Sequence, residues 1–180
     1  MIEREFVKLL IKRLARIDGE DGWTDGLNPA QLMALEYLER ANRFSRSPSQ
    51  VAEFMGSTRG TVSQTLKVLA SKGYIAEEKS ETDRRSITYL LTAKGRDVVS
   101  ASGAVGQSLD GFSVAELRKL ADTLRTTLDR AIQGNGQRPF GICRTCQHFS
   151  PKRDGGHCRL LDVALEMPET NQICFEQIPV

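Results

Sequence analysis

All four cysteines of this chain lie beyond residue 142, and their spacing suits metal chemistry. Cys143, Cys146, Cys158 and Cys174 form a C-x2-C-x11-C-x15-C pattern. Four thiolates are a complete ligand set for tetrahedral zinc or for a cubane iron–sulfur cluster. Residues 139–180 are too few to bury an adequate core by themselves. We therefore expect a small irregular domain over 139–180 that is stapled by a metal bound to these four cysteines.

The spacing favours an iron–sulfur cluster over zinc. Zinc sites usually combine two closely spaced pairs, whereas only Cys143 and Cys146 are close here, and Cys158 and Cys174 stand alone. This arrangement resembles that of high-potential iron–sulfur proteins, although the loop lengths differ, and the resemblance implies a [4Fe–4S] cluster. The alternatives are a zinc ion and a redox dithiol without metal. With four cysteines present, we expect His148 and His157 to be neighbours of the site or surface residues rather than ligands.

A thiol redox enzyme is an alternative of another class. It would use Cys143 and Cys146, but no βαβ pattern surrounds them, as a thioredoxin-like site requires. We therefore predict that the chain is not an enzyme.

A second group of side chains that could do chemistry follows a helical period after Gly56. Val62, Leu66 and Leu69 share one face at 100° per residue and are expected to be buried. The other side carries groups suited to base edges and phosphates in a major groove. The candidate DNA-binding residues on this helix are Arg59, Gly60, Thr61, Ser63, Gln64 and Lys67.

Two strands joined by a basic tip follow this helix. The strands are predicted over 74–79 and 86–91, the second by its alternation of apolar and polar residues. Arg84 and Arg85 at the tip are suited to the negative potential of a minor groove, and Asp83 could hold one of them in position. The order of helix, turn, helix and ribbon is that of a winged helix-turn-helix.

Caps and apolar stripes place the remaining helices. Asn28, Ser47 and Ser113 each begin a capping box, and the first two are followed by proline at the first helical position. A helix is predicted over 2–18, a loop from Gly19 to Gly26, a helix from Thr92 to about Leu109 and a long amphipathic helix over 113–133. The fold class is therefore mainly α, with long helices, a small wing and the irregular cysteine-containing domain.

The composition describes a soluble globular chain with a local basic zone. Hydrophobic residues make up 39% and charged residues 27%. Residues 40–96 hold 11 Lys or Arg against 5 Asp or Glu, which indicates a polyanionic partner. There is no apolar run long enough to span a bilayer and no secretory signal pattern. We expect a cytoplasmic protein, in which clustered cysteines bind metal or do redox chemistry.

Residues 28–110 resemble the MarR family of winged helix regulators. The resemblance rests on the segments 27–32, 60–75 and above all 82–95, where Thr-Asp-Arg-Arg leads to Leu-Thr-Ala-Lys-Gly. It extends over about 2–133 and implies a homodimer, held by the first and last helices, that binds an operator and represses transcription. It also implies a small aromatic effector, whose cleft Trp23 and Tyr37 could line.

We thus predict three parts. They are a DNA-binding and dimerisation domain over 1–133, a linker over 134–138 and a four-cysteine domain over 139–180. In this prediction a cluster that senses redox state or iron modulates operator binding. A small-molecule-responsive regulator with a structural zinc site is the alternative.

Overall fold

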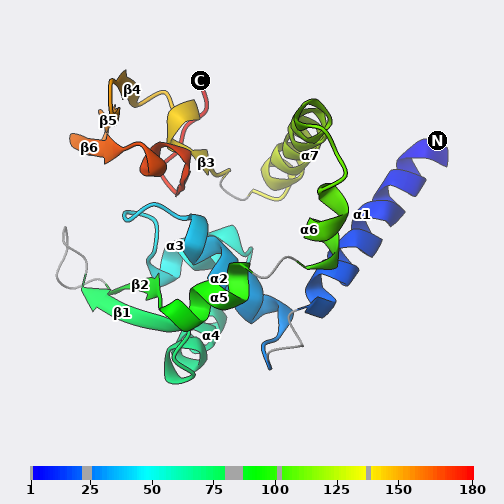
Figure 1. Ribbon diagram of the computed structural model, residues 1–180, viewed down its shortest axis with the longest axis horizontal. Coiled ribbons are helices and arrows are strands. Elements are labelled where there is room, and N and C mark those ends of the chain that lie inside the picture. The colour runs from blue at the N-terminus through cyan, green and yellow to red at the C-terminus, as the bar shows by residue number, and fades with distance from the viewer. Residues whose placement is uncertain (1, 22–25, 80–86, 101–102, 137–138) are drawn as a thin grey trace.

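The computed structural model describes residues 2–21, 26–79, 87–100, 103–136 and 139–180. A helical unit with a two-stranded hairpin occupies the centre, long helices lie on one side of it, and a small β-rich unit lies above it (Figure 1). This helix-rich architecture with small antiparallel sheets confirms the predicted fold class. The helices are α1 (Ile2–Asp21), α2 (Pro29–Arg40), α3 (Pro48–Phe54), α4 (Arg59–Ser71), α5 (Ala93–Ser100), α6 (Ala104–Leu109) and α7 (Val114–Gly134).

The core lies where α2, α3, α4 and the hairpin meet. Capping boxes begin α2 and α3, as predicted. In α2, Asn28 Oδ1 accepts from the backbone N–H of Gln31 at 2.9 Å, and Gln31 Oε1 accepts from the backbone N–H of Asn28. Most of the fully buried side chains come from these helices, and those of α4 are the predicted Val62, Leu66 and Leu69. The largest of them are Leu27, Leu35, Tyr37, Leu38, Val51, Val62, Leu66 and Leu69.

Strands β1 (Ile75–Lys79) and β2 (Ile87–Leu91) form the antiparallel hairpin. Its base is fixed by α5, whose Gly95 lies against the backbone: a Cβ at this position would stand 2.2 Å from the Tyr74 carbonyl oxygen. The Thr92 hydroxyl donates to the carbonyl of Gly73 and accepts from the Gly95 amide. The Leu-Thr-x-x-Gly motif therefore serves to close the helix onto the hairpin.

Two predicted element boundaries were wrong. Helix α1 continues to Asp21 instead of ending at residue 18, and Arg16 bonds Glu20 one turn later at 3.1 Å, which supports the extra turn. The helix expected from Thr92 to Leu109 is two helices, α5 and α6, because the backbone of Gly103 is extended and begins a new helix; residues 101–102 lie outside the described residues. Helix α7 begins at its predicted Ser113 cap.

The segment after residue 138 folds into short strands and two 3-10 turns. Strands β4 (Phe149–Lys152), β5 (Gly155–Cys158) and β6 (Val163–Glu166) form an antiparallel sheet, and β3 (Gly141–Ile142) pairs with β7 (Ile173–Cys174). The turns are η1 (Cys143–Thr145) and η2 (Pro168–Asn171). We call residues 139–180 the cysteine unit.

None of the described helices combines the length and apolar character needed to cross a bilayer.

Candidate functional site

Helix α4 presents a polar face to solvent. Its first turn is capped by Thr58, whose hydroxyl oxygen accepts from the Thr61 amide at 3.2 Å. Val62, Leu66 and Leu69 anchor the opposite face in the core. All the predicted DNA-binding residues of this helix therefore lie on its accessible side: Ser63 is half-buried, and Arg59, Gly60, Thr61, Gln64 and Lys67 are exposed.

A groove of about 800 Å³ runs beside this helix. Arg59 and Ser63 from α4, Lys79 and Thr88 from the hairpin, and Ser47 and Ser49 at the start of α3 line it. Arg43 and Arg46 add two further cations, against the acids Glu78 and Glu176. A groove rich in guanidinium, ammonium and hydroxyl groups matches the chemistry of a phosphate backbone. The wing residues Asp83, Arg84 and Arg85 lie outside the described residues.

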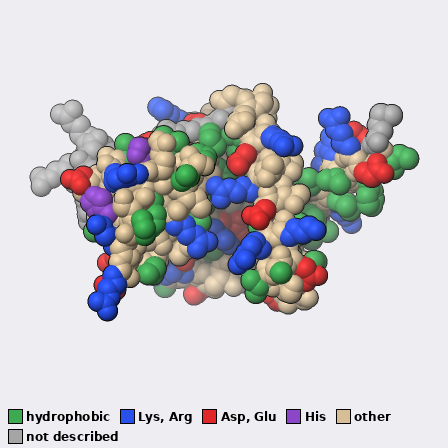
Figure 2. Space-filling view, turned by 90° about the horizontal axis from the view of Figure 1, so that it is seen from above, with side chains coloured by type: hydrophobic (Ala, Val, Ile, Leu, Met, Phe, Trp, Pro, Cys, Tyr) green, Lys and Arg blue, Asp and Glu red, His purple; other side chains and the backbone are tan. Residues whose placement is uncertain are grey.

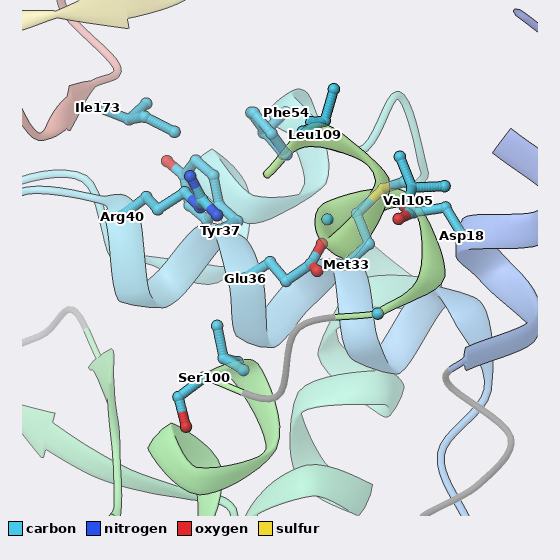
Figure 3. Close-up of a pocket in the computed structure, with 13 residues that line it drawn as sticks. Asp18, Met33, Glu36, Tyr37, Arg40, Phe54, Ser100, Val105, Leu109 and Ile173 are labelled. Atoms are coloured by element: carbon cyan, nitrogen blue, oxygen red, sulfur yellow. The ribbon is translucent and has the colours of Figure 1, made fainter. Parts of the chain in front are cut away.

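A second cavity, of about 560 Å³, lies between α2 and α6 (Figure 3). Met33, Glu36, Tyr37 and Arg40 follow one side of α2, with Ile173 of the cysteine unit at one end and Asp18 at the other. Burial, with a smaller contribution from Asp18, raises the pKa of Glu36. From above, Lys and Arg side chains gather around the hollow between the cysteine unit and α7 (Figure 2). Tyr37, a buried core residue, borders the cavity between α2 and α6, and Trp23 lies outside the described residues.

The cysteine unit brings two sulfurs into direct contact. Cys143 and Cys174 are buried and share a side-chain hydrogen bond, and Cys158 lies close enough to act on Cys143 electrostatically. Cys146 is buried one 3-10 turn after Cys143, and its amide donates to the Cys143 carbonyl at 3.0 Å. All four cysteines are free. The contact therefore joins Cys143 to Cys174 rather than to Cys146, the partner expected for a thiol enzyme.

Polar groups surround Cys174. The neighbouring Cys143 thiol does most to lower the pKa of Cys174, and Asn42, the Glu176 backbone amide and Ser45 lower it further. The pKa of Cys143 is raised, chiefly because its thiol is the donor in that bond and because it is buried. The pair thus favours a thiolate on Cys174.

The side-chain chemistry of the four cysteines fits a metal that is bound by thiolates. Within the described part of the chain, however, no three His, Cys, Asp or Glu side chains stand in an arrangement that could hold a metal ion. Both histidines face other polar groups: His157 Nε2 lies 3.1 Å from Asp162 Oδ1, and His148 Nε2 lies 3.2 Å from Gln147 Nε2.

The contact between the cysteine unit and the rest of the molecule was not predicted from the sequence. The cysteine unit docks on the winged unit, which comprises α2 to α5 and the β1–β2 hairpin. The residues that join α2 to α3 make this contact: the Asn42 amide donates to the Ile173 carbonyl at 2.8 Å, and Arg43 pairs with Glu169 and donates to the Ala164 carbonyl. Phe54 of α3 also packs on Phe140, with ring centroids 4.6 Å apart. Asn42 and Ser45 are polar residues in a loop, and no local pattern marks them.

Helices α3 and α4, the turn between them and the following hairpin define a winged helix-turn-helix. Residues 25–86 match the model of the MarR family. The chain is 30% identical over 113 residues to the transcriptional repressor MprA of Escherichia coli K12, a match that covers 60% of this chain and 64% of that repressor. It thus spans less than two thirds of the relative's length.

Solved structures show the same fold. A MarR transcriptional regulator of Methanosarcina mazei aligns with a TM-score of 0.56 at 22% identity, over 72% of this chain and 98% of the other. FabT of Streptococcus pneumoniae, solved in complex with DNA, aligns with a TM-score of 0.54 at 24% identity, over 73% and 95%. Together the comparisons show that the winged part of this chain is similar to MarR family proteins. The family match ends before the cysteine unit.

Proposed function

We propose that this chain is a cytoplasmic, homodimeric transcriptional regulator that represses by binding an operator. Helix α4 enters the major groove, where Gln64, Ser63 and Thr61 meet base edges. Arg59 and Lys67 bind guanine or phosphate, and Gly60 allows close approach. The observation that carries this proposal is the exposed polar face of α4 beside a cationic groove, on a fold that FabT shares.

The dimer is supported by apolar faces of the long helices. Leu120, Leu124 and Leu128 of α7 are 39–47% exposed, and α1 exposes Phe6, Leu10 and Leu14 among others. Apolar stripes of this extent indicate a protein interface. A second copy of the chain would cover them and present two copies of α4 to one duplex.

The cavity at α2 suits a small aromatic effector that carries an acid group. Arg40 supplies a cation, and Tyr37, Met33 and Phe54 supply apolar and aromatic surface. Its walls come from α2, α5 and α6, with Asp18 of α1, Phe54 of α3 and Ile173 of the cysteine unit, so a ligand there would contact both the helices and the cysteine unit.

The DNA-binding proposal is tested by selecting duplexes from a random pool. Fluorescence anisotropy should then give an affinity at least about 10³-fold above that for random duplex at the same salt. Replacing Arg84 and Arg85 together with alanine should weaken binding at least about tenfold and flatten its salt dependence. Equal affinity for selected and random duplexes would contradict sequence-specific regulation.

We also propose that Cys143, Cys146, Cys158 and Cys174 bind a [4Fe–4S] cluster, with zinc as the alternative. Such a cluster would supply a redox-active, iron-dependent state next to the DNA-binding unit. Four free cysteines in one small unit, two of them in contact, support this role. An anaerobic absorption spectrum tests it: broad visible absorbance with stoichiometric iron is expected, and a colourless protein with one zinc per chain contradicts the cluster.

A further inference from the structure

Asn42, the second residue after α2, joins the winged unit to the cysteine unit through its side-chain and backbone N–H groups. It is 1% exposed. Its Nδ2 donates to Cys143 Sγ at 3.3 Å, its backbone amide donates to the Ile173 carbonyl, and its Oδ1 accepts from the Phe44 amide at 3.1 Å. The side chain therefore belongs to the surroundings of the sulfurs as much as to the loop.

Ser45 makes a contact beside the second sulfur. It is also 1% exposed, and its Oγ accepts from the amide of Phe175, the residue after Cys174, at 2.9 Å. The loop of residues 41–47, which we call the α2–α3 loop, thus bonds the Cys143 sulfur directly and the backbone next to Cys174.

The Asn42 donor is suited to respond to a change in the state of the Cys143 sulfur. A protonated thiol is only a weak acceptor, whereas an N–H group directed at a metal-bound thiolate forms a stronger, charge-assisted bond. Such surrounding donors orient the ligands of a metal and tune its affinity. A buried donor from another part of the chain therefore links the Cys143 sulfur to the α2–α3 loop.

The same loop continues into the DNA-binding elements. Gln50 of α3 donates to the Phe44 carbonyl at 2.8 Å, and the Tyr89 amide of β2 donates to the Arg46 carbonyl at 3.1 Å. Arg43 and Arg46 of the loop line the cationic groove. Val163 lines it as well and packs against the buried cysteines. A shift of the loop would therefore reach α3, the wing and the groove together.

We propose that the α2–α3 loop is part of the cysteine site, and that Asn42 is the positioning residue that couples the state of the Cys143 and Cys174 sulfurs to DNA affinity. This inference rests on the proposed DNA binding and deepens the proposed metal site. By linkage, a metal that changes operator affinity must have its own affinity changed by DNA by the same factor.

The test compares wild type with Asn42→Asp, which keeps the acceptor for Phe44 but replaces the amide donor with a carboxylate. Cobalt(II) added anaerobically to metal-free protein reports on the site through sulfur-to-metal charge-transfer absorbance. We expect Asn42→Asp to weaken cobalt binding about 10- to 100-fold. It should also remove the change in operator affinity that cobalt causes in wild type.

Arg43→Gln is the matched control, since it breaks a contact between the same loop and the cysteine unit without touching a sulfur. It should leave cobalt affinity within about threefold of wild type. Ser45→Ala is the second variant, used where Asn42→Asp fails to fold by circular dichroism, and the same losses are expected from it.

A metal-free arm separates this inference from the metal proposal. Capping the thiols with methyl methanethiosulfonate should change operator affinity in wild type and not in Asn42→Asp. If wild type takes up neither cobalt nor iron, the metal proposal fails, but this difference still supports the coupling. If cobalt and capping both leave wild-type operator affinity unchanged, or change it equally in Asn42→Asp, the inference is overturned.

Discussion

Gln64 and Lys67 lie one turn apart on the exposed face of α4 and are expected to do different work on DNA. The amide of Gln64 can both donate and accept, as recognition of a base edge requires, whereas the Lys67 ammonium suits phosphate. Gln64→Ala should cost about 1–3 kcal/mol on the selected duplex and relax the preference at one base pair. Lys67→Ala should weaken binding to selected and random duplexes alike. It should also reduce the slope of log affinity against log salt concentration by about one.

Anisotropy titrations at three salt concentrations check both variants. Ser71→Ala, at the far end of the same helix, is the control and should bind as wild type does. A loss of specificity in Lys67→Ala but not in Gln64→Ala would reverse the roles given to these two residues.

Glu36 gives a prediction about stability and pH. Because burial raises its pKa in the folded protein, the folded state holds the proton more tightly than the unfolded chain. The favourable contribution is present at low pH and is lost as the pH rises through the folded pKa. Glu36→Gln should therefore raise the Tm at pH 7 by about 1–3 °C, with the gain disappearing near pH 4.

Thermal melts of Glu36→Gln and of the exposed control Glu39→Gln at the two pH values test this. The same shift in both variants, or a shift that does not depend on pH, would show that burial of the Glu36 carboxylate is not its cause.

At the scale of elements, the junction of the hairpin with α5 depends on Gly95. A Cβ there would meet the Tyr74 carbonyl oxygen at 2.2 Å, and backbone cannot yield as a flexible side chain can. Gly95→Ala should therefore destabilise the fold by about 2 kcal/mol or more. Gly111→Ala is the control, because its Cβ would have no neighbour within 4 Å. Urea melts measure both, and equal stability of the two variants would contradict this role for the junction.

The elements that the sequence predicted well are those with local causes. The boxes at Asn28, Ser47 and Ser113 begin their helices, and the apolar stripe of α4 is buried, because both signals lie within a few residues. The docking of Asn42 on Cys143 joins residues 101 positions apart and could not be predicted from any local pattern. The extra turn of α1 differs from the prediction because Gly19 to Gly26 is rich in glycine and acidic residues, a composition that favours a loop.

At the scale of the whole molecule, the proposed DNA binding requires a second copy of the chain. Leu124, at 47% exposure, lies in the middle of the apolar stripe of α7. Leu124→Glu should place a charge in the dimer interface, give a monomer in sedimentation experiments, and reduce affinity for a two-half-site duplex at least about 100-fold. Lys119→Glu, on the same helix, is the charge control. A stable dimer in Leu124→Glu would mean that another face pairs the subunits.

Hydroxyl-radical footprinting of the selected duplex tests the central claim most directly. Two helices α4 held by a dimer should occupy two major-groove half-sites about one helical turn, or 10 base pairs, apart, with protection on the flanking minor grooves where the wings reach. Two such patches related by symmetry are the predicted result. A single patch, or uniform protection along the duplex, would contradict a dimeric winged helix regulator.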